Sequence, residues 1–403
     1  MWPDFDIAVK PISCDVVLMS NRSDVDIAVV GGGASGLATA VSAAIAGFRV
    51  VVFAPPSEIA PSRTAALLAG SVALLIDLDV WPLLERHSAP LRTIRIVDAT
   101  RRLLRAPELA FHASEVGLPA FGHNVPNAIL ADALRRHASG FEAIEIIERP
   151  VTSVDLSGER PVLSDGAQAW APRLVVAADG INSIVRDAAG IDVRRWAYRQ
   201  SALVATFSIA VPHRNASTEF HTEAGPLTLV PLPGDRVSLV WVDRPDDMAR
   251  HLALEADDFA RLVERRVSSI HGAMRLDGPR AAFPLSAALA DRYAARRAVL
   301  VGEAAHLFPP IGAQGLNLGF RDVDALRALF RRHRDDPGAG VALTAYDTAR
   351  RGDIRSRTLA VDLLNRSLLT GLLPVQAIRG LGIGLAIASP VFRRALMRRG
   401  LAA

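Results

Sequence analysis

GEAAHLFPPIGAQGLNLGFRD, residues 302–322, is the stretch that decides the fold of this chain of 403 residues. It follows an apolar run, residues 298–301, that is typical of a buried strand, and it leads into an apolar-periodic helix predicted over residues 316–330. The glycines within it leave a loop with few side chains, so backbone N–H groups can approach a large flat ligand. The start of the helix adds partial positive charge at the same point.

A second segment has the glycine spacing of a dinucleotide-binding turn. Gly31, Gly33 and Gly36 fit the pattern GxGxxG directly after a strand predicted over residues 25–30. The first glycine permits a tight turn, the second a close approach to a pyrophosphate, and the third close packing of the following helix on the strand. That helix is rich in alanine, and a further strand predicted over residues 49–53 completes a βαβ unit. The sequence therefore predicts a dinucleotide site here.

The acid that usually holds the adenosine ribose, about 20 residues past the glycines, is missing. Ala54 stands at that position, and the next acid, Glu58, follows two prolines. Because these prolines restrict the path of the chain, we expect backbone groups and water to hold the ribose instead of Glu58.

A third segment begins with Asp179 and Gly180, after a strand predicted over residues 174–178. Ser183 and Arg186 follow, one helical turn apart, and such groups suit a diphosphate and its neighbouring sugar. Alone, the segment also fits an ordinary turn with a capping aspartate. Together with the other two segments it predicts a flavin dinucleotide, because the reduced flavin ring carries negative charge that the helix start in the first segment can balance.

These three segments, in this order, resemble the class A flavoprotein aromatic hydroxylases and, within that class, the ubiquinone-biosynthesis hydroxylases. Further stretches that support the resemblance are residues 63–67, 90–98, 115–126, 219–220, 225–233 and 240–241. The resemblance implies an α/β fold, in which a Rossmann-like FAD-binding domain of the glutathione reductase type is interleaved with a β-sheet substrate domain and followed by C-terminal helices.

The domain boundaries that we predict combine this resemblance with changes in the sequence pattern. Alternating strands and a hairpin turn at residues 233–235 replace the βαβ pattern in the middle of the chain. We expect a disordered extension at 1–23, an FAD-binding domain at 24–190 and 281–345, a substrate domain at 191–280, with 92–125 on the substrate side, and a helical region at 346–403.

The resemblance also implies an activity. NAD(P)H would dock transiently, because the chain has a single dinucleotide fingerprint, and would reduce the FAD. O₂ would add at C4a of the flavin, and the hydroperoxide would hydroxylate the ring of a polyprenylated phenol in ubiquinone biosynthesis. Three alternatives share the flavin segments: a hydroxylase of a soluble phenol, another flavin oxidoreductase, and a non-catalytic flavin-binding subunit of a biosynthetic complex.

The expected site residues come from all three segments and from one arginine between them. The expected cofactor contacts are Gly31, Gly33, Ala34, Ser35, Gly36, Arg63, Asp179, Gly180, Glu303, Gly312, Gly315, Leu316 and Asn317. Pro309, Pro310 and His306 are candidates for the pocket beside the ring, although packing at the end of the strand is the favoured role for His306. No side chain stands out as an acid–base catalyst. Besides Ala54, two residues depart from the family pattern: Glu303 replaces the usual aspartate, and Ala313 replaces a usual glycine.

The composition fits a globular enzyme and argues against other classes. Half of the residues are hydrophobic, and Cys14 is the only cysteine, so we expect a reducing cytosol and neither disulfides nor a cysteine metal site. No His/Asp/Glu cluster has metal-ligand spacing. The net charge is +4, but the basic residues are spread among acids and only 5% of residues are aromatic, so nucleic-acid binding is not expected.

The C-terminal region carries apolar runs flanked by arginines, among them Arg379, Arg393 and Arg398. No run reaches the ~18 uncharged apolar residues of a spanning helix. Two interpretations stay open: the region lies on the anionic inner face of the cell membrane, or it packs on the body of the enzyme. A membrane-dissolved substrate or a ubiquinone-biosynthesis complex would favour the first.

Overall fold

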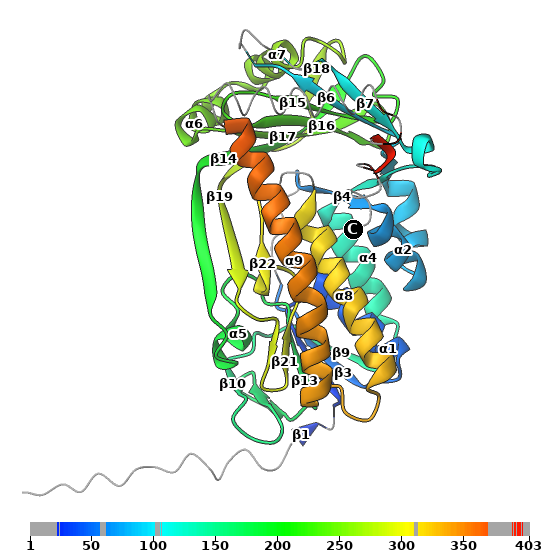
Figure 1. Ribbon diagram of the computed structural model, residues 1–403, viewed down its shortest axis with the longest axis vertical. Helices are drawn as coiled ribbons and strands as arrows, with labels where there is room; N and C mark the ends of the chain where they lie inside the picture. The colour runs from blue at the N-terminus through cyan, green and yellow to red at the C-terminus, as the bar shows by residue number, and fades with distance from the viewer. Residues whose placement is uncertain are drawn as a thin grey trace, which may run out of the picture.

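The computed structural model describes residues 22, 23, 25–56, 62–100, 105, 107–309, 313–369, 389, 391, 393–395 and 397, with the backbone alone for 22, 23 and 356–369. They form two lobes (Figure 1), which we call the cofactor lobe and the sheet lobe. A six-stranded sheet forms the centre of the cofactor lobe, and a nine-stranded sheet forms the sheet lobe.

The six-stranded sheet is built from short apolar strands that are buried on both faces, as parallel strands are. In spatial order they are β20 (Ala294–Ala295), β21 (Ala298–Leu300), β13 (Leu174–Ala177), β2 (Ile27–Val30), β3 (Val50–Phe53) and β9 (Ile144–Ile147). All neighbours are parallel except β20, which pairs antiparallel with β21. The carboxyl ends of β21, β13 and β2 therefore meet at one edge.

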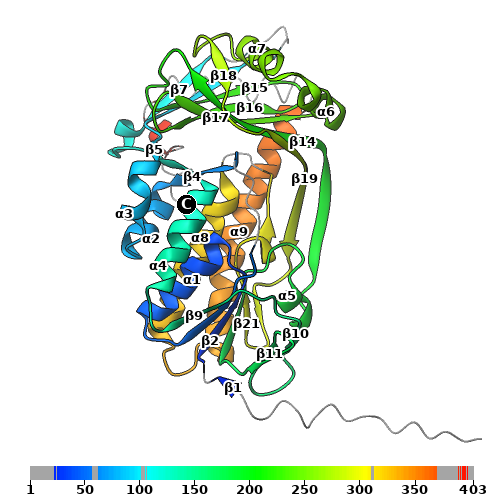
Figure 2. The ribbon, with the colours of Figure 1, turned by 180° about the vertical axis from the view of Figure 1, so that it is seen from behind.

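Helices cover one face of this sheet, and a smaller sheet covers the other (Figure 2). The helices are α1 (Ala34–Ile45), α4 (Asn127–Ser139), α8 (Gln314–Arg332) and α9 (Gly340–Leu369). The smaller sheet contains β1 (Arg22–Ser23), β12 (Ala169–Trp170), β11 (Val162–Ser164) and β10 (Ser153–Asp155), and α5 (Ile184–Ala188) lies beside it. Phe53 meets Trp170 edge-on, with 4.9 Å between ring centroids, so the core is continuous from sheet to sheet.

The sheet lobe contains the strands that the sequence predicted as alternating. Their spatial order is β22 (His306–Leu307), β19 (Ala281–Ala290), β14 (Val193–Ile209), β17 (Arg236–Asp243), β16 (Pro226–Leu232), β15 (Ala216–His221), β6 (Thr93–Asp98) and β7 (Leu109–His112), and β18 (Met274–Leu276) pairs with β14. Helices α6 (Pro245–Ala253) and α7 (Ala256–Arg266) bury one face of the sheet, where Phe207, Leu239 and Phe259 share a core. Strand β14 is 17 residues long and extends through both lobes (Figure 1).

A three-stranded sheet connects the lobes. It contains β4 (Thr64–Leu68), β8 (Gly122–Pro126) and β5 (Ala89–Pro90), and α2 (Ala69–Asp77), α3 (Trp81–Leu84), η1 (Glu85–His87) and η2 (Ala113–Val116) accompany it. The side-chain amide of Asn124 in β8 donates to the carbonyl oxygen of Pro231 in β16 at 2.9 Å. The hydroxyls of Thr64 in β4 and Ser238 in β17 lie 2.9 Å apart. These bonds fix the two lobes against each other.

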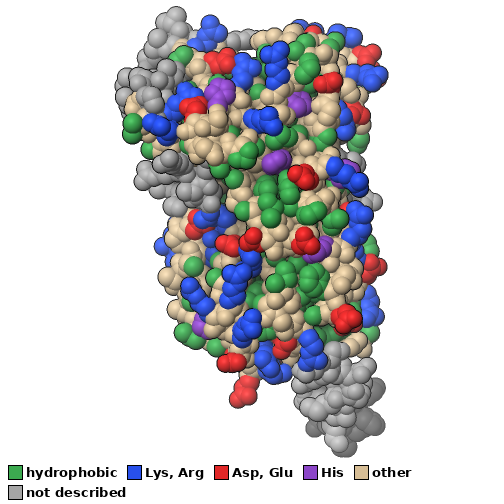
Figure 3. Space-filling model, turned by 90° about the vertical axis from the view of Figure 1, so that its right-hand side faces the viewer, with side chains coloured by type: hydrophobic (Ala, Val, Ile, Leu, Met, Phe, Trp, Pro, Cys, Tyr) green, Lys and Arg blue, Asp and Glu red, His purple; other side chains and the backbone are tan. Residues whose placement is uncertain are grey.

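The predicted fold class is confirmed: a Rossmann-like α/β lobe interleaves with a β-sheet lobe, and a long helix follows. Strand β14 is partly exposed over residues 193–199 and almost wholly buried over residues 200–209. On the face in Figure 3, arginine and acidic side chains are interspersed. No helix within the described ranges is both long and apolar enough to cross a membrane.

Candidate functional site

The three glycine turns that the sequence singled out meet at one edge of the six-stranded sheet. A Cβ on Gly31 would lie 2.1 Å from the carbonyl oxygen of Ala178, so the first turn touches the end of β13. A Cβ on Gly319 would lie 2.4 Å from Oγ of Ser35 and 3.4 Å from Cα of Gly302. The turn after β2, the turn after β13 and the turn between β21 and α8 are therefore in mutual contact.

The glycines of these turns fall into two kinds. Gly31 and Gly36 face the protein itself, since a Cβ on Gly36 would lie 2.1 Å from the carbonyl oxygen of Gly31. Gly33 and Gly315 are exposed, and a Cβ on either would meet no atom within 4 Å. Packing explains the first pair but not the second. Open space above a glycine is what the close approach of a ligand needs.

The helices that follow the first and third turns, α1 and α8, begin without a side-chain cap. Gly33 is the N-cap of α1 and Ala313 the N-cap of α8, and neither helix has an acid in its first turn. The first N–H groups of each helix have no partner within the helix, and they carry the positive end of its dipole. Two uncapped helix starts beside open glycines fit the phosphates and the anionic ring edge of a reduced flavin dinucleotide.

Two acids flank these helix starts. Oδ2 of Asp179 accepts a hydrogen bond from the backbone N–H of Ile184 at 2.9 Å, whereas Oδ1 is buried and has no partner within the described parts of the chain. Burial raises the pKa of the Asp179 carboxyl, against hydrogen bonds from Ser183 and backbone amides. Glu303 is exposed on η3 (Gly302–Ala304). An acceptor without a donor fits the hydroxyls of a ribityl chain or a ribose, so the residues present fit FAD.

The structure corrects the prediction that Ser183 and Arg186 suit a diphosphate. Ser183 is fully buried, and its hydroxyl accepts from the backbone N–H of Arg186 at 3.0 Å, as the N-cap of α5. The guanidinium of Arg186 is 1% exposed and donates to the carbonyl oxygens of Ile181, at 3.0 Å, and Ala304, at 3.3 Å. Arg186 therefore ties the second turn to the third, and its side chain has almost no exposed surface with which to contact a diphosphate. Nothing in the sequence around Arg186 indicated that its side chain would point into the protein.

Asn317 has a different position from the one expected for a residue in contact with the flavin. Its Oδ1 accepts from the backbone N–H of Leu68, at 2.8 Å, and from the hydroxyl of Ser71, at 2.7 Å. Its Nδ2 donates to the carbonyl oxygens of Ala66, at 2.8 Å, and Ala313, at 2.5 Å. The side chain is thus fully engaged in fixing the start of α8 to β4 and α2. The N–H groups of Gly315 and Leu316, before Asn317, have no acceptor within the first turn of α8.

His306 lies in the protein core and not on an open surface. It is 2% exposed, and Nε2 lies 2.8 Å from Oδ2 of Asp322, which also accepts from the backbone N–H of Gly302 at 2.9 Å. Nε of Arg350 donates to Oδ1 of Asp322 at 2.6 Å. Burial alone would raise the pKa of Asp322, but the charges of His306 and Arg350 lower it overall. This array holds the third turn against α8 and α9, which favours the packing role of His306 over a catalytic one.

Two further predicted residues that the structure describes are Arg63 and Pro309. Arg63 is exposed next to β4, and its guanidinium carbon lies 5.3 Å from the ring centroid of Phe283 in β19. Pro309 is buried. Glu58, Pro310 and Gly312 lie outside the described residues. The sequence did not point to Asn127, at the start of α4, whose Oδ1 is buried without a partner in the described chain and whose N–H donates to the carbonyl oxygen of Arg63 at 3.0 Å.

One face of the nine-stranded sheet looks toward the cofactor lobe. The bond between Ser238 and Thr64 identifies this face, because β4 belongs to the cofactor side. Directly opposed residues in paired strands, and residues two apart in one strand, share a face. The register therefore places Val240, Thr228 and Glu219 on the same face as Ser238. We call it the cofactor-facing surface.

A polar pair interrupts this surface. Nε2 of His221 lies 2.6 Å from Oε1 of Glu219, and His221 is 7% exposed. On the same face, Ile96 and Thr228 are opposite Glu219, Asp98 is opposite His221, and the valines Val240, Val242 and Val204 lie two and three strands away. A carboxylate and an imidazole, two residues apart at the edge of this valine-lined part of the surface, can exchange a proton with a bound hydroxyl. In the sequence, Glu219 was noted only within a stretch that supports the family resemblance, and His221 was not singled out.

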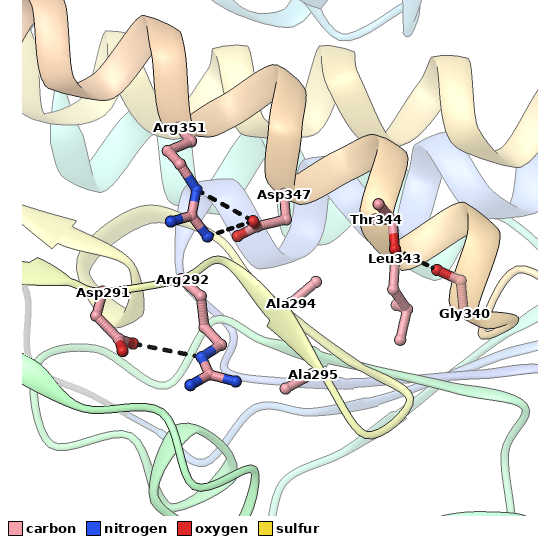
Figure 4. Close-up of a pocket in the computed structure, with 9 residues that line it drawn as sticks. All are labelled: Asp291, Arg292, Ala294, Ala295, Gly340, Leu343, Thr344, Asp347 and Arg351. Atoms are coloured by element: carbon pink, nitrogen blue, oxygen red, sulfur yellow. Dashed lines mark hydrogen bonds and ion pairs between the residues drawn. The ribbon is translucent and has the colours of Figure 1, made fainter.

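A separate open cavity, of about 470 Å³, lies between β20 and the first turns of α9 (Figure 4). Its charged side chains pair with each other: Arg351 donates to Asp347 at 2.5 Å, and Arg292 lies 3.7 Å from Asp291. The cavity shares no residue with the three turns. We therefore place the functional site at the turns and not here.

Comparisons with known proteins agree with this geometry. The family described as FAD binding domain matches residues 24–356. The chain is 35% identical over 388 residues to the ubiquinone hydroxylase UbiL of Rhodospirillum rubrum, across 93% of this chain and 89% of that protein. It is 31% identical over 399 residues to the 3-demethoxyubiquinol 3-hydroxylase of Escherichia coli, across 93% of this chain and 98% of that protein. The solved structure of the p-nitrophenol 4-monooxygenase PnpA from Pseudomonas putida matches with a TM-score of 0.77 at 18% identity, across 94% of this chain and 98% of that one.

Proposed function

Because this chain belongs to the ubiquinone hydroxylases among the FAD-dependent monooxygenases, we propose that it hydroxylates the ring of a polyprenylated phenol in ubiquinone biosynthesis. O₂ is the proposed co-substrate and NAD(P)H the proposed electron donor. Bound FAD supplies the redox chemistry, since reduced flavin activates O₂. The protein supplies binding, orientation and a proton acceptor.

The proposed cofactor contacts follow from the three turns. The N–H groups at the start of α1, beside Gly33, would bind the pyrophosphate, because they have no partner in the helix. Asp179 and Glu303 would accept hydrogen bonds from sugar and ribityl hydroxyls. The N–H groups of Gly315 and Leu316 would face the anionic edge of the reduced ring. We keep Gly31, Ala34, Ser35, Gly36, Arg63, Gly180 and Gly312 as proposed members of the same cradle, and Pro309 and Pro310 as proposed members of the ring-side pocket.

Asn317 is a positioning residue in this proposal. Its four hydrogen bonds hold the N-terminus of α8 at a fixed distance from β4. A shift of that N-terminus would move two N–H groups away from the ring edge. Preorganised dipoles of this kind stabilise developing charge without rearrangement during the reaction.

The cofactor-facing surface is the proposed binding site of the phenol ring. Val204, Val240 and Val242 would exclude water from the ring, because an apolar wall leaves water no hydrogen-bond partner. The pair of His221 and Glu219 would hold the proton of the ring hydroxyl. Removing that proton makes the ring more electron-rich, which favours attack on an electrophilic oxygen.

The observation that carries this proposal is the meeting of three glycine turns beneath a sheet surface that combines a row of valines with the pair of Glu219 and His221. The test uses purified holoenzyme, NAD(P)H, and two phenols that differ only in a short isoprenoid tail. We expect NAD(P)H oxidation coupled to a product that is heavier by one oxygen atom, with ¹⁸O₂ as the source, and a preference for the tailed phenol. Coupled turnover with the plain phenol alone would favour a soluble-phenol hydroxylase. No turnover with either, despite bound and reducible FAD, would contradict the proposed reaction.

We also propose the domain division of the sequence: FAD-binding parts at 24–190 and 281–345, a substrate domain at 191–280 with a contribution from 92–125, and terminal regions at 1–23 and 346–403. Its support is that β6 pairs in parallel with β15 in the nine-stranded sheet. Strand β19 (Ala281–Ala290) pairs with β14 in the same sheet, so these residues contribute to the substrate side as well. A peripheral position on the inner face of the cytoplasmic membrane, or within a ubiquinone-biosynthesis complex, is part of the same proposal. Arg379 and Arg398, predicted to contribute to membrane contact, lie outside the described residues.

A further inference from the structure

The described C-terminal residues pack on the sheet lobe, more than 270 positions away in sequence from their contacts. Arg393 forms an ion pair of 2.7 Å with Glu115, which is 278 residues earlier in the chain, and it also donates to the carbonyl oxygen of Ala110. Its guanidinium carbon lies 5.2 Å from the ring centroid of Phe111. Burial alone would raise the pKa of Glu115, but the hydrogen bond and charge of Arg393 lower it overall.

Met397, one helical turn after Arg393, is 7% exposed within an apolar cluster. The buried members of this cluster are Leu109, Phe111, Ala113, Phe121 and Met397, and Ile94, Ile96, Val116 and Leu118 pack against it. An ion pair, a cation–π contact and a buried methionine therefore fix this part of the C-terminus to β6, β7 and η2. Of the two interpretations of the C-terminal region, packing on the enzyme describes these residues.

The cluster lies on the cofactor-facing surface. Ile96 is opposite Glu219 in the pairing of β6 with β15, and Leu109 is opposite Ile96 in the pairing of β7 with β6. Opposed residues share a face, so both point to the same side of the sheet as the pair of Glu219 and His221. Since neighbouring strands are ~4.8 Å apart, the apolar cluster begins one strand away from that polar pair.

We propose that the C-terminal residues at Arg393 and Met397 determine specificity for the substrate's isoprenoid tail. In this proposal, which rests on the proposed function, the ring hydroxyl meets Glu219 and His221, and the tail extends along the cofactor-facing surface onto the cluster around Met397. Methionine suits this role, because its unbranched, polarizable side chain adapts to apolar partners of different shape. Arg393 is a positioning residue: its ion pair with Glu115 holds Met397 in the wall.

The first test uses the full-length holoenzyme with Met397→Ala, Arg393→Glu, Glu115→Arg and the double charge reversal. The substrates are a phenol with a tail of two isoprene units and the same phenol without the tail. We expect Met397→Ala and Arg393→Glu to raise KM for the tailed phenol about tenfold, with kcat and the KM of the plain phenol near wild type. We expect the double reversal to bring the KM for the tailed phenol most of the way back to the wild-type value, because the ion pair is restored with opposite polarity.

Glu115 also accepts from the backbone N–H of His112 at 2.8 Å, so Glu115→Arg alone can disturb η2, and Met397→Ala is the variant that decides. The matched control is charge reversal of Arg236 in β17, which forms an ion pair of 2.6 Å with Asp277 and is separated from β6 by β16 and β15. We expect that variant to leave both KM values unchanged. FAD affinity and the melting temperature are measured for every variant.

The inference is overturned if Met397→Ala leaves the KM of the tailed phenol unchanged, or raises both KM values equally. The proposed function fails separately, if the wild-type enzyme turns over neither phenol. A wild type that is active on both phenols, with a KM ratio that no C-terminal variant alters, leaves the proposed function standing and refutes this inference alone.

Discussion

A matched pair of glycine substitutions separates the ligand role of the first turn from its packing role. Gly33 has φ −71° and ψ 170°, which any residue adopts, and a Cβ there would meet no atom within 4 Å. Gly36 is buried, and its Cβ would lie 2.1 Å from the carbonyl oxygen of Gly31. Gly33→Ala therefore changes only the space outside the protein, whereas Gly36→Ala forces α1 away from β2.

The magnitudes follow from these distances. In the FAD-free protein, Gly33→Ala should raise the free energy of unfolding by about 0.4–1 kcal/mol, because alanine restricts the unfolded chain. It should lower the same free energy by a similar amount, because alanine is a poorer N-cap than glycine. The free energy of unfolding should stay within about 0.5 kcal/mol of wild type. With FAD, the methyl group occupies the space through which a pyrophosphate approaches the N–H groups of α1. Loss of one charge-assisted hydrogen bond, about 1.5–3 kcal/mol, weakens FAD binding by about 10- to 100-fold.

Two measurements check this prediction. Titration of the FAD-free protein, followed by quenching of flavin fluorescence, gives the dissociation constant, and circular dichroism gives the melting temperature with and without FAD. Gly36→Ala should lower the melting temperature of the FAD-free protein, since overpacking of this kind costs about 1–3 kcal/mol or more. The reasoning is wrong if Gly33→Ala binds FAD with wild-type affinity, or if it destabilises the FAD-free protein as much as Gly36→Ala does.

Three further predictions concern the third turn and its support. Ala313→Gly should raise the free energy of unfolding by about 1 kcal/mol in urea titrations, because Ala313 has φ +55° and a left-handed conformation costs alanine ~1–2 kcal/mol; an unchanged or lower value would contradict the strain. Asp322→Asn should cost about 3 kcal/mol in the same assay, because it removes one of the two carboxylates, Asp322 and Asp353, that pair with the buried guanidinium of Arg350. Because the pKa of Asp322 is lowered in the folded protein, the stability that its ionised carboxylate contributes is complete above the unfolded pKa near 3.8 and is lost as pH falls through the folded pKa. As pH is lowered from 6 to 2, the melting temperature should therefore fall more steeply in the wild type than in Asp322→Asn. Parallel curves for the two proteins would exclude this linkage. Asn317→Ala should cost about 3 kcal/mol and weaken FAD binding as well, because the start of α8 loses its attachment to β4, and wild-type FAD affinity in a destabilised variant would show that Asn317 does not position the site.

Much of the cofactor lobe was predictable because its signals are local. A glycine at the end of a buried strand, followed by a helix, is a pattern of about ten consecutive residues, and three such patterns predicted three adjacent parallel strands. Boundaries were less accurate: α8 begins at Gln314, earlier than the predicted position 316, because a helix start depends on backbone conformation as well as on periodicity.

The orientation of polar side chains was not predictable from the sequence. Arg186 and Asp179 belong to the same turn, yet one is bonded inside the protein and the other keeps an oxygen without a partner. Asn317 lies in the motif that suggested a flavin contact, but its hydrogen bonds go to a segment about 250 residues earlier. Such partners are set by which segments the fold brings together, and a local pattern does not contain that information.

The amino-acid sequence by itself determined the α/β class, the three glycine turns and the kind of ligand that such turns bind, because steric freedom at glycine and the alternation of buried strands are properties of short segments. The tertiary structure alone decided that Glu219 and His221 share a surface with Ile96 and that Arg393 reaches Glu115. The register of the sheet and the packing of the C-terminal residues on it depend on many weak contacts between residues far apart in the sequence. Their outcome appears only when the whole chain is folded.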